Sequence, residues 1–305
     1  TSLANAESGT ENTGCALFGA TVTDLHSGGG VDLESGNYQW NIACYAGEAD
    51  TATVDFSGWT TQRYNYIQIY TPAEPTQVGA TQRHSGIWTS RGYRLQTDVS
   101  GTHSLEMGHP YMWINGLQIE QQNDYSCVAT DAAVAAGWIK VSNSIIRYSG
   151  SGSSNYGLIL TNSSNIVTSY VWNSIFIDFN GGSSAALHTR AEAGAATEAY
   201  FYNNTIYNAN IGISNHATYP AAIYAVNNIT QNCTNGYDGT FAAASDHNIS
   251  DIAGDAPNAS FSTAALSVDF RDAANDDLHL AEFDIAARDQ GADATGIAGQ
   301  SDIDG

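Results

Sequence analysis

Basic residues are scarce in this chain. Its 305 residues contain 9 Lys and Arg against 31 Asp and Glu, a formal net charge of −22, and Lys140 is the only lysine. A chain with this charge repels nucleic acid and anionic membranes, so the sequence predicts neither nucleic-acid binding nor membrane insertion. An acid excess with almost no lysine is typical of an extracellular or saline setting.

Long apolar runs and closely paired cysteines are also lacking. No apolar run is long enough to span a membrane. The four cysteines, Cys15, Cys44, Cys127 and Cys233, have no C-x-x-C spacing, which argues against a zinc site. They form either disulfides or buried thiols, and Cys15–Cys44 is the expected pair because both lie near the N-terminus. The chain begins at Thr1 without Met or a signal peptide, so we expect a processed or trimmed chain.

An internal repeat is the main pattern present. Five segments place Asn two residues before Ile or Leu, after an apolar stretch, with the asparagines at 115, 143, 173, 204 and 227. Residues alternate between apolar and polar around each motif, which indicates short strands. No segment has the apolar periodicity of a long amphipathic helix, so we expect the strands to lack the helical crossovers of an ordinary parallel sheet. The sequence therefore predicts an all-β, single-stranded parallel β-helix solenoid with terminal caps.

The repeated asparagines have a structural explanation. Asn tolerates left-handed backbone angles at a coil corner, and its amide can bond to the Asn of the next coil. We expect Asn115, Asn143, Asn173, Asn204 and Asn227 to form this ladder. The isoleucines expected to lie buried beneath it are Ile145, Ile175, Ile206 and Ile229.

The repeats divide the chain into three parts. Residues 1–30 precede the strands and are expected to form an N-terminal cap or lead-in. Residues 31–250 carry the parallel β-helix, and the acidic, Ala-rich residues 251–305 are expected to cap its C-terminal end. Caps are needed because the terminal coils of a solenoid expose their core and strand edges.

Several segments carry a family resemblance. They are Ile42-Ala43-Cys44-Tyr45, Phe56-Ser57-Gly58-Trp59-Thr60-Thr61, Tyr66-Ile67-Gln68-Ile69 and Tyr111-Met112-Trp113-Ile114-Asn115-Gly116-Leu117-Gln118-Ile119. With the Asn repeats, they resemble the pectate-lyase-like superfamily of right-handed parallel β-helices, and in particular surface β-helix proteins of environmental bacteria and phages. The resemblance implies a right-handed helix at an extracellular, cell-surface or virion location. Its members include sugar-cleaving enzymes, phage tailspikes and non-catalytic surface proteins.

Residues for catalysis are few along the repeats. Uronate lysis needs cations and a base, and the coils offer little beyond Lys140, Arg147 and Arg190. Glycoside hydrolysis needs two nearby carboxyls, for which Asp178, Glu192 and Glu198 are the candidates. A polar cluster of His188, Arg190 and His216 is expected because Leu187 and Ile213 occupy equivalent places on successive coils, but it also fits a plain loop-facing cluster.

Binding residues are equally open to interpretation. The aromatic side chains of Trp59, Tyr64, Trp88 and Tyr93 are candidates for glycan or partner contacts. Ca²⁺ is the one cofactor left open, with Asp293, Asp302 and Asp304 as candidate ligands. We therefore predict a non-catalytic structural or adhesive module of a fibre, spike or decoration type that forms an oligomer or a larger surface assembly, or binds a glycan. The alternative is a polysaccharide-degrading enzyme, either a tailspike-like glycoside hydrolase or a polysaccharide lyase.

Overall fold

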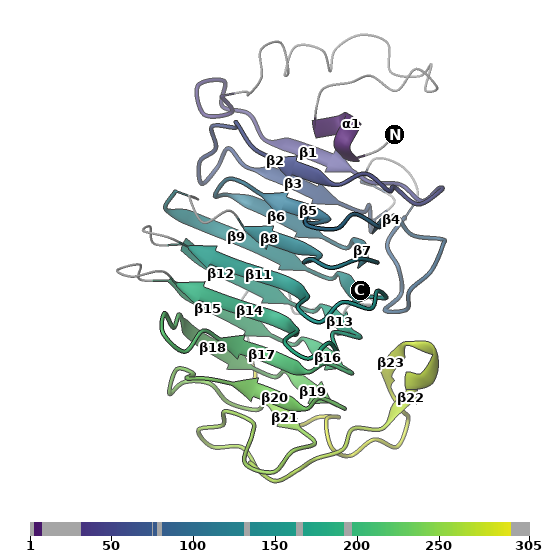
Figure 1. Ribbon diagram of the computed structural model, residues 1–305, viewed down its shortest axis with the longest axis vertical. Helices are drawn as coiled ribbons and strands as arrows, with labels where there is room; N and C mark the ends of the chain where they lie inside the picture. The colour runs from purple at the N-terminus through teal and green to yellow at the C-terminus, as the bar shows by residue number, and fades with distance from the viewer. Residues whose placement is uncertain are drawn as a thin grey trace.

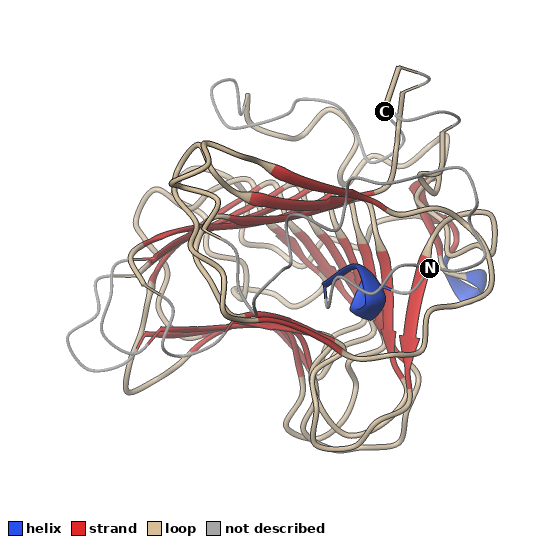
Figure 2. Cartoon of the chain, turned by 90° about the horizontal axis from the view of Figure 1, so that it is seen from above, coloured by secondary structure: helices blue, strands red, loops and turns tan. Residues whose placement is uncertain are grey.

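Three parallel sheets wind around a single apolar interior. The computed structural model describes residues 3–7, 32–74, 76–77, 81–130, 135–162, 167–191 and 197–293. They form a nearly all-β parallel solenoid of about seven turns (Figure 1). Seen along the long axis, the sheets surround the interior on three sides (Figure 2). The predicted fold class is confirmed.

Each coil contributes one strand to each sheet over most of the solenoid. The first sheet contains β1 (Trp40–Ala43), β3 (Ile67–Tyr70), β6 (Met112–Asn115), β9 (Gly137–Ser142), β12 (Val167–Trp172), β15 (Glu198–Tyr202) and β18 (Ala222–Val226). The second contains β4 (Arg94–Thr97), β7 (Gln118–Gln121), β10 (Ile145–Tyr148), β13 (Ile175–Ile177), β16 (Thr205–Tyr207), β19 (Ile229–Gln231) and β21 (Ile249–Ser250). The third contains β2 (Val54–Phe56), β5 (Leu105–Met107), β8 (Val128–Thr130), β11 (Tyr156–Asn162), β14 (Ala185–Ala191), β17 (Ile211–Asn215) and β20 (Asn235–Asp238).

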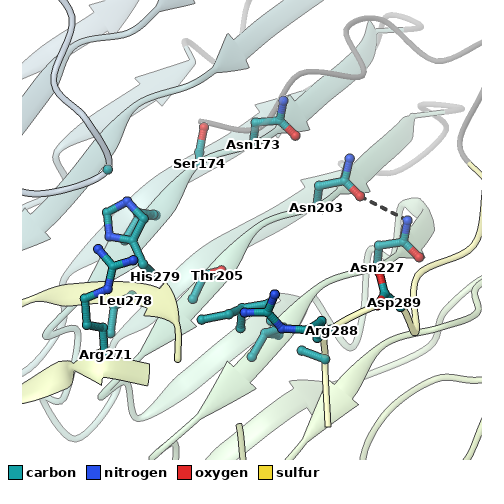
Figure 3. A pocket seen from close by; sticks show the side chains of 15 residues that line it. Asn173, Ser174, Asn203, Thr205, Asn227, Arg271, Leu278, His279, Arg288 and Asp289 are labelled. Atoms are coloured by element: carbon teal, nitrogen blue, oxygen red, sulfur yellow. Dashed lines mark hydrogen bonds between the residues drawn. The ribbon is translucent and has the colours of Figure 1, made fainter. Parts of the chain in front are cut away.

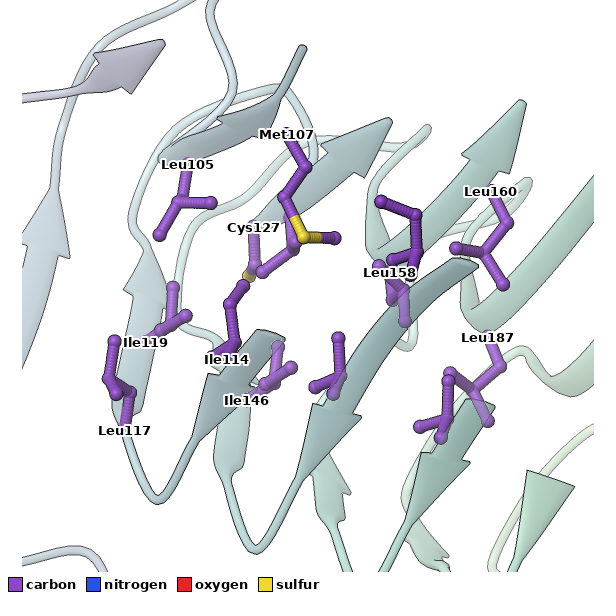
Figure 4. Packing of buried hydrophobic residues seen from close by; sticks show 14 of the residues in the cluster. Leu105, Met107, Ile114, Leu117, Ile119, Cys127, Ile146, Leu158, Leu160 and Leu187 are labelled. Carbon is purple, nitrogen blue, oxygen red and sulfur yellow. The ribbon is translucent and has the colours of Figure 1, made fainter. Parts of the chain in front are cut away.

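The interior is filled by aligned rows of apolar side chains. Successive residues of a strand point to opposite faces of the sheet, so every second residue faces the interior. Strand pairing aligns these inward residues into rows along the solenoid. In the first sheet, such a row is fully buried and consists of Ile114, Val141, Val171, Phe201 and Ala225. Figure 4 shows the interior where the three sheets meet, with Leu105, Ile119 and Leu158 among its residues.

The corner between the first and second sheets uses the left-handed backbone conformation. Strand register aligns the residues with positive φ there: Gly116, Asn143, Asn173, Asn203 and Asn227. The predicted ladder is therefore correct for Asn143, Asn173 and Asn227. Asn115 precedes the corner glycine, yet its Oδ1 accepts from Asn143 Nδ2 (2.9 Å), so it still bonds to the next coil as predicted. Asn204 follows the corner asparagine and bonds to Asn228 (3.0 Å). Glycine and asparagine both tolerate this conformation, so the motif alone does not settle the register.

A second, buried ladder runs directly beside this corner. In each coil a side-chain oxygen accepts a hydrogen bond from the backbone N–H of the preceding coil. The bonds are Leu117 N to Ser144 Oγ (3.2 Å), Ser144 N to Ser174 Oγ (3.3 Å), and Ser174 N to Asn204 Oδ1, Asn204 N to Asn228 Oδ1 and Asn228 N to Asn248 Oδ1 (each 3.1 Å). These bonds satisfy amides that the bend removes from the sheet ladders.

The isoleucines near the ladder do not share one environment. Ile206 aligns with Ile146 and Phe176 and lies in the core. Ile145, Ile175 and Ile229 instead belong to an outward-facing row of the second sheet. Ile145, Ile175 and Ile206 are buried as expected and Ile229 is partly buried, but of these four only Ile206 belongs to the main core. The two-residue period of a strand sends neighbouring apolar residues to opposite faces.

The C-terminal segment covers part of that outward row. The antiparallel strands β22 (Phe270–Asp272) and β23 (Asp277–Leu280), joined by a 3-10 turn over Ala273–Asn275, lie beside the second sheet (Figure 1). Leu278 forms a small apolar cluster with Ile145, Ile175 and Ile177 outside the main core. At the other end, the short helix α1 (Leu3–Glu7) lies against β2, and Leu3 is 2% exposed. No helix within the described ranges is long and apolar enough to cross a membrane.

Candidate functional site

The histidine cluster forms on the outside of the third sheet. Leu187 pairs with Ile213 as expected, and the rings of His188 and His216 lie 6.1 Å apart. Tyr156 stacks on His188 at 4.8 Å. Burial lowers the pKa of His188 to about 4, with further contributions from His216 and Arg190. His188 is therefore neutral near pH 7 and packs as one ring in an aromatic column.

The candidate carboxylates do not converge. Asp178 lies at the corner after the second sheet with φ of 70°, and Asn208 Nδ2 donates to its Oδ1 at 2.5 Å. Asn232 Nδ2 donates in turn to Asn208 Oδ1 at 3.3 Å, so Asp178 belongs to a further corner ladder. Glu198 begins a strand of the first sheet and accepts a hydrogen bond from Tyr200 (3.0 Å). Glu192 lies outside the described residues.

The four candidate binding aromatics have different environments. Trp59 is 4% exposed and stacks on Trp40 in the core, and Tyr93 is 6% exposed and donates to Asp50. Burial leaves both rings without a surface for a ligand, so neither is a binding residue. The Trp88 ring lies over the Arg147 guanidinium at 3.8 Å. Tyr64 is 71% exposed, and the Arg63 guanidinium lies 5.6 Å from its ring centroid.

The metal and disulfide candidates fall largely outside the described residues. Asp302 and Asp304 are not described, and within the described ranges no group of three His, Cys, Asp or Glu side chains could hold a metal ion. Cys15 is likewise not described, and Cys44 is a buried free thiol, as is Cys127. Burial raises the pKa of both thiols, which makes them poor nucleophiles.

One buried ionic cluster was not expected from sequence. Glu120, on the second sheet, is 2% exposed and accepts hydrogen bonds from Arg147 Nε (2.9 Å), Gln122 Nε2 (3.0 Å) and Gln96 Nε2. Burial acts to raise the pKa of Glu120, but these partners together lower it. Arg147 also reaches Asp276 of the C-terminal segment at 3.6 Å, so the cluster ties that segment to the solenoid.

The first sheet carries the most distinctive surface. Its outward rows place eight side chains on one side of the solenoid, which we call the aromatic face: Trp113, Trp138, Lys140, Tyr170, Trp172, Tyr200, Tyr202 and Tyr224. The Tyr170, Tyr200 and Tyr224 rings stack in a column with centroid separations of 5.2 and 4.7 Å. Those three rings and the two end tryptophans, Trp113 and Trp138, are partly exposed.

The single lysine continues this column. Lys140 aligns with Tyr170 and places its ammonium 4.4 Å from the Trp138 ring centroid and 5.7 Å from that of Trp113. Burial raises the pKa of Tyr200 to about 12, helped by Glu198 and the neighbouring tyrosines, so its hydroxyl stays protonated. The face is thus flat, aromatic and rich in hydroxyl groups.

A sequence signal for this face exists. The column residue lies three positions before the left-handed corner residue in every repeat from Trp113 to Tyr224, and it is aromatic in all of them except Lys140.

Comparison of the chain with family models, with curated proteins and with solved structures gives no match. Fold and surface chemistry are therefore the observations that bear on function.

Proposed function

We propose that this chain is a non-catalytic β-solenoid of an extracellular or virion surface that binds an extended neutral polysaccharide along the aromatic face. The observation that carries the proposal is the column of Tyr170, Tyr200 and Tyr224, whose rings repeat at 5.2 and 4.7 Å. A ligand with a comparable repeat, such as an extended chain of sugars, meets an equivalent contact at every coil. The net charge of −22 favours a neutral ligand over an anionic one, because Lys140 is the one cation among the side chains of the aromatic face.

The mode of contact follows from the stacking. Neighbouring tyrosine rings cover each other's faces, so a sugar chain lies across their edges and hydrogen-bonds to the phenol hydroxyls. The rings are held by strand pairing and by their neighbours, so little conformational entropy is lost on binding. Tyrosine and tryptophan supply large contact areas together with a polar atom, which suits a hydroxylated ligand.

Glu120 and Glu198 do not form the carboxylate pair that cleavage needs. Glycoside hydrolysis needs a protonated acid beside a second carboxylate. Glu120, the carboxylate most deeply buried in the ionic cluster, holds three hydrogen bonds and a lowered pKa, so it lacks a proton to donate. Glu198, at the start of β15, accepts a hydrogen bond from the Tyr200 hydroxyl (3.0 Å).

The binding proposal is tested with a panel of soluble neutral polysaccharides and isothermal titration calorimetry. Tyr200→Ala is expected to weaken binding at least about tenfold, because tyrosine often carries a large share of interface energy. Tyr125→Ala, an exposed ring between β7 of the second sheet and β8 of the third, is the matched control and should bind as wild type. Equal affinities for both variants would reject the aromatic face as the site.

The same panel separates binding from catalysis. We expect no new reducing ends and no unsaturated uronates, with or without Ca²⁺. Binding should persist when Asp178, His188, His216 and Glu192 are each changed to Ala. If product appears and Asp178→Ala or His188→Ala abolishes it, the chain is a polysaccharide-degrading enzyme.

A further inference from the structure

A cavity lies between the solenoid and its own C-terminal segment. It measures about 550 Å³, within the usual range for small-molecule sites (Figure 3). The corner asparagines Asn173, Asn203 and Asn227 line the solenoid side. The opposite side is lined by the C-terminal segment, including Arg271, Leu278, His279 and Arg288.

The walls are held in place by paired hydrogen bonds. Asn227 Nδ2 donates to Ala292 O (2.9 Å) while Ala292 N donates to Asn227 Oδ1 (2.8 Å). Gln231 makes the same two-way contact with Val268, at 2.9 and 2.6 Å. The cavity is therefore preformed, and a ligand does not have to order the segment that encloses it.

The lining of this cavity is richer in arginine than the chain as a whole. Two of the nine basic residues, Arg271 and Arg288, line the cavity, and Asp289 is the one carboxylate among the described lining residues. Arg271 is 64% exposed, and its Nη1 lies 4.0 Å from the Asp277 carboxylate, which also contacts His279. Arg288 donates from Nη2 to Ala281 O (2.9 Å), which uses one of its five N–H donors.

The other lining groups suit a hydroxylated ligand. Asn203 lines the cavity, and its Oδ1 accepts from Asn227 Nδ2 (3.0 Å), so the ladder uses its oxygen and not its amide N–H donors. Thr205 adds a hydroxyl, while Ile229 and Leu278 add apolar surface for the carbon skeleton of a ring. Guanidinium groups bind carboxylate and sulfate oxygens through paired N–H donors.

We propose that this cavity binds a small oxyanion carried by a hydroxylated, sugar-sized molecule. The two arginines contact the oxyanion, and Asn203 and Thr205 contact hydroxyl groups. The site lies between the second sheet and the C-terminal segment, so the proposal stands independently of the aromatic face on the first sheet.

Titration calorimetry with glucose 6-sulfate, gluconate and glucose tests the proposal on the intact chain. We expect saturable binding of at least one of the two anions, and affinity for glucose at least about tenfold weaker, as for loss of a charge-assisted hydrogen bond. Which anion binds more tightly identifies sulfate or carboxylate as the preferred group. Arg271→Gln and Arg288→Gln should each weaken anion binding about tenfold or more.

Arg63→Gln is the control, because it removes the same charge from an exposed residue that does not line the cavity. Its affinity for the anion should equal that of wild type, and circular dichroism checks that all three variants are folded. The proposal is overturned by equal binding of glucose and both anions, by no saturable binding of either anion, or by unchanged affinity in both cavity variants.

Discussion

Arg147 is the residue whose loss tests the packing of the C-terminal segment most sharply. Its Nε contacts the buried Glu120 at 2.9 Å, its guanidinium lies 3.8 Å from the Trp88 ring centroid, and Nη1 reaches Asp276 at 3.6 Å. One side chain thus joins the second sheet, the loop that carries Trp88, and the segment after the solenoid. We consider its replacement by Met, which keeps much of the apolar stem.

The cost is dominated by Glu120. Removing one partner of a buried ion pair leaves an uncompensated charge and costs about 3–5 kcal/mol. Glu120 keeps its hydrogen bonds from Gln96 and Gln122, which places the expected loss near the lower end of that range. The partly exposed pair with Asp276 adds at most about 1 kcal/mol. Met packs on the Trp88 ring and offsets part of the lost cation–π contact. We expect Arg147→Met to lower the free energy of unfolding by about 3–4 kcal/mol.

Urea denaturation at several pH values measures this loss. The lowered pKa of Glu120 gives stability that is present above its ordinary value of 4.5 and is lost as pH falls through the lower folded value. Without Arg147, the pKa of Glu120 is higher than in the wild type, so Glu120 is protonated at a higher pH in the variant. The deficit of Arg147→Met should therefore shrink as pH falls below 4.5.

Two further variants make the result decisive. Glu120→Gln combined with Arg147→Met should recover part of the loss, because no buried charge remains. Lys140→Met removes a cation that contacts aromatic rings but pairs with no described carboxylate, so it should cost less, about 1–2 kcal/mol. A loss below about 1 kcal/mol for Arg147→Met, or a deficit that grows as pH falls, would refute this account of the cluster.

Asn204→Ala should lower the free energy of unfolding by about 1–3 kcal/mol in urea denaturation, because it leaves the buried Ser174 N–H without its acceptor. Asn203→Gly, at the exposed corner, should lower it little. Similar losses for the two variants would contradict the separation of the two ladders. Burial lowers the pKa of His84 to about 3 and that of His188 to about 4, so both are neutral when folded and charge on unfolding. The free energy of unfolding should accordingly decline as pH falls from about 6.5 toward 4, and a rise over that window in thermal melts would be inconsistent with these environments. Cys44 should resist a thiol reagent in the native protein and react on denaturation, and rapid native labelling would show that it is accessible.

Local pattern was sufficient for the solenoid itself. The repeated Asn with flanking apolar alternation predicts short stacked strands, because a two-residue period without helical crossovers leaves few other parallel folds. The pairing of Leu187 with Ile213, and hence the neighbouring histidines, followed from the same repeat. Asn143 and Asn173 could be aligned because each of their repeats offers a single asparagine at the corner, whereas the Asn227-Asn228 pair offers two.

Register and function required the assembled structure. In Asn203-Asn204 either residue can occupy a left-handed corner, and only pairing with the adjacent coils selects Asn203. The structure also shows that Asp178, a candidate acid, accepts a hydrogen bond from Asn208 within a corner ladder. Trp59 and Tyr93, candidate binding residues, are buried.

The sequence by itself determined what each repeat does locally, namely a short strand, a corner that needs Asn or Gly, and an inward apolar residue. Only the tertiary structure decided which outward side chains share a surface. Strand stacking brings Tyr170, Tyr200 and Tyr224 into one column, and the returning C-terminal segment places Arg271 and Arg288 over the corner asparagines. Residues 24 to more than 100 positions apart meet in these ways because coil stacking and chain reversal are long-range events, and no local propensity encodes them.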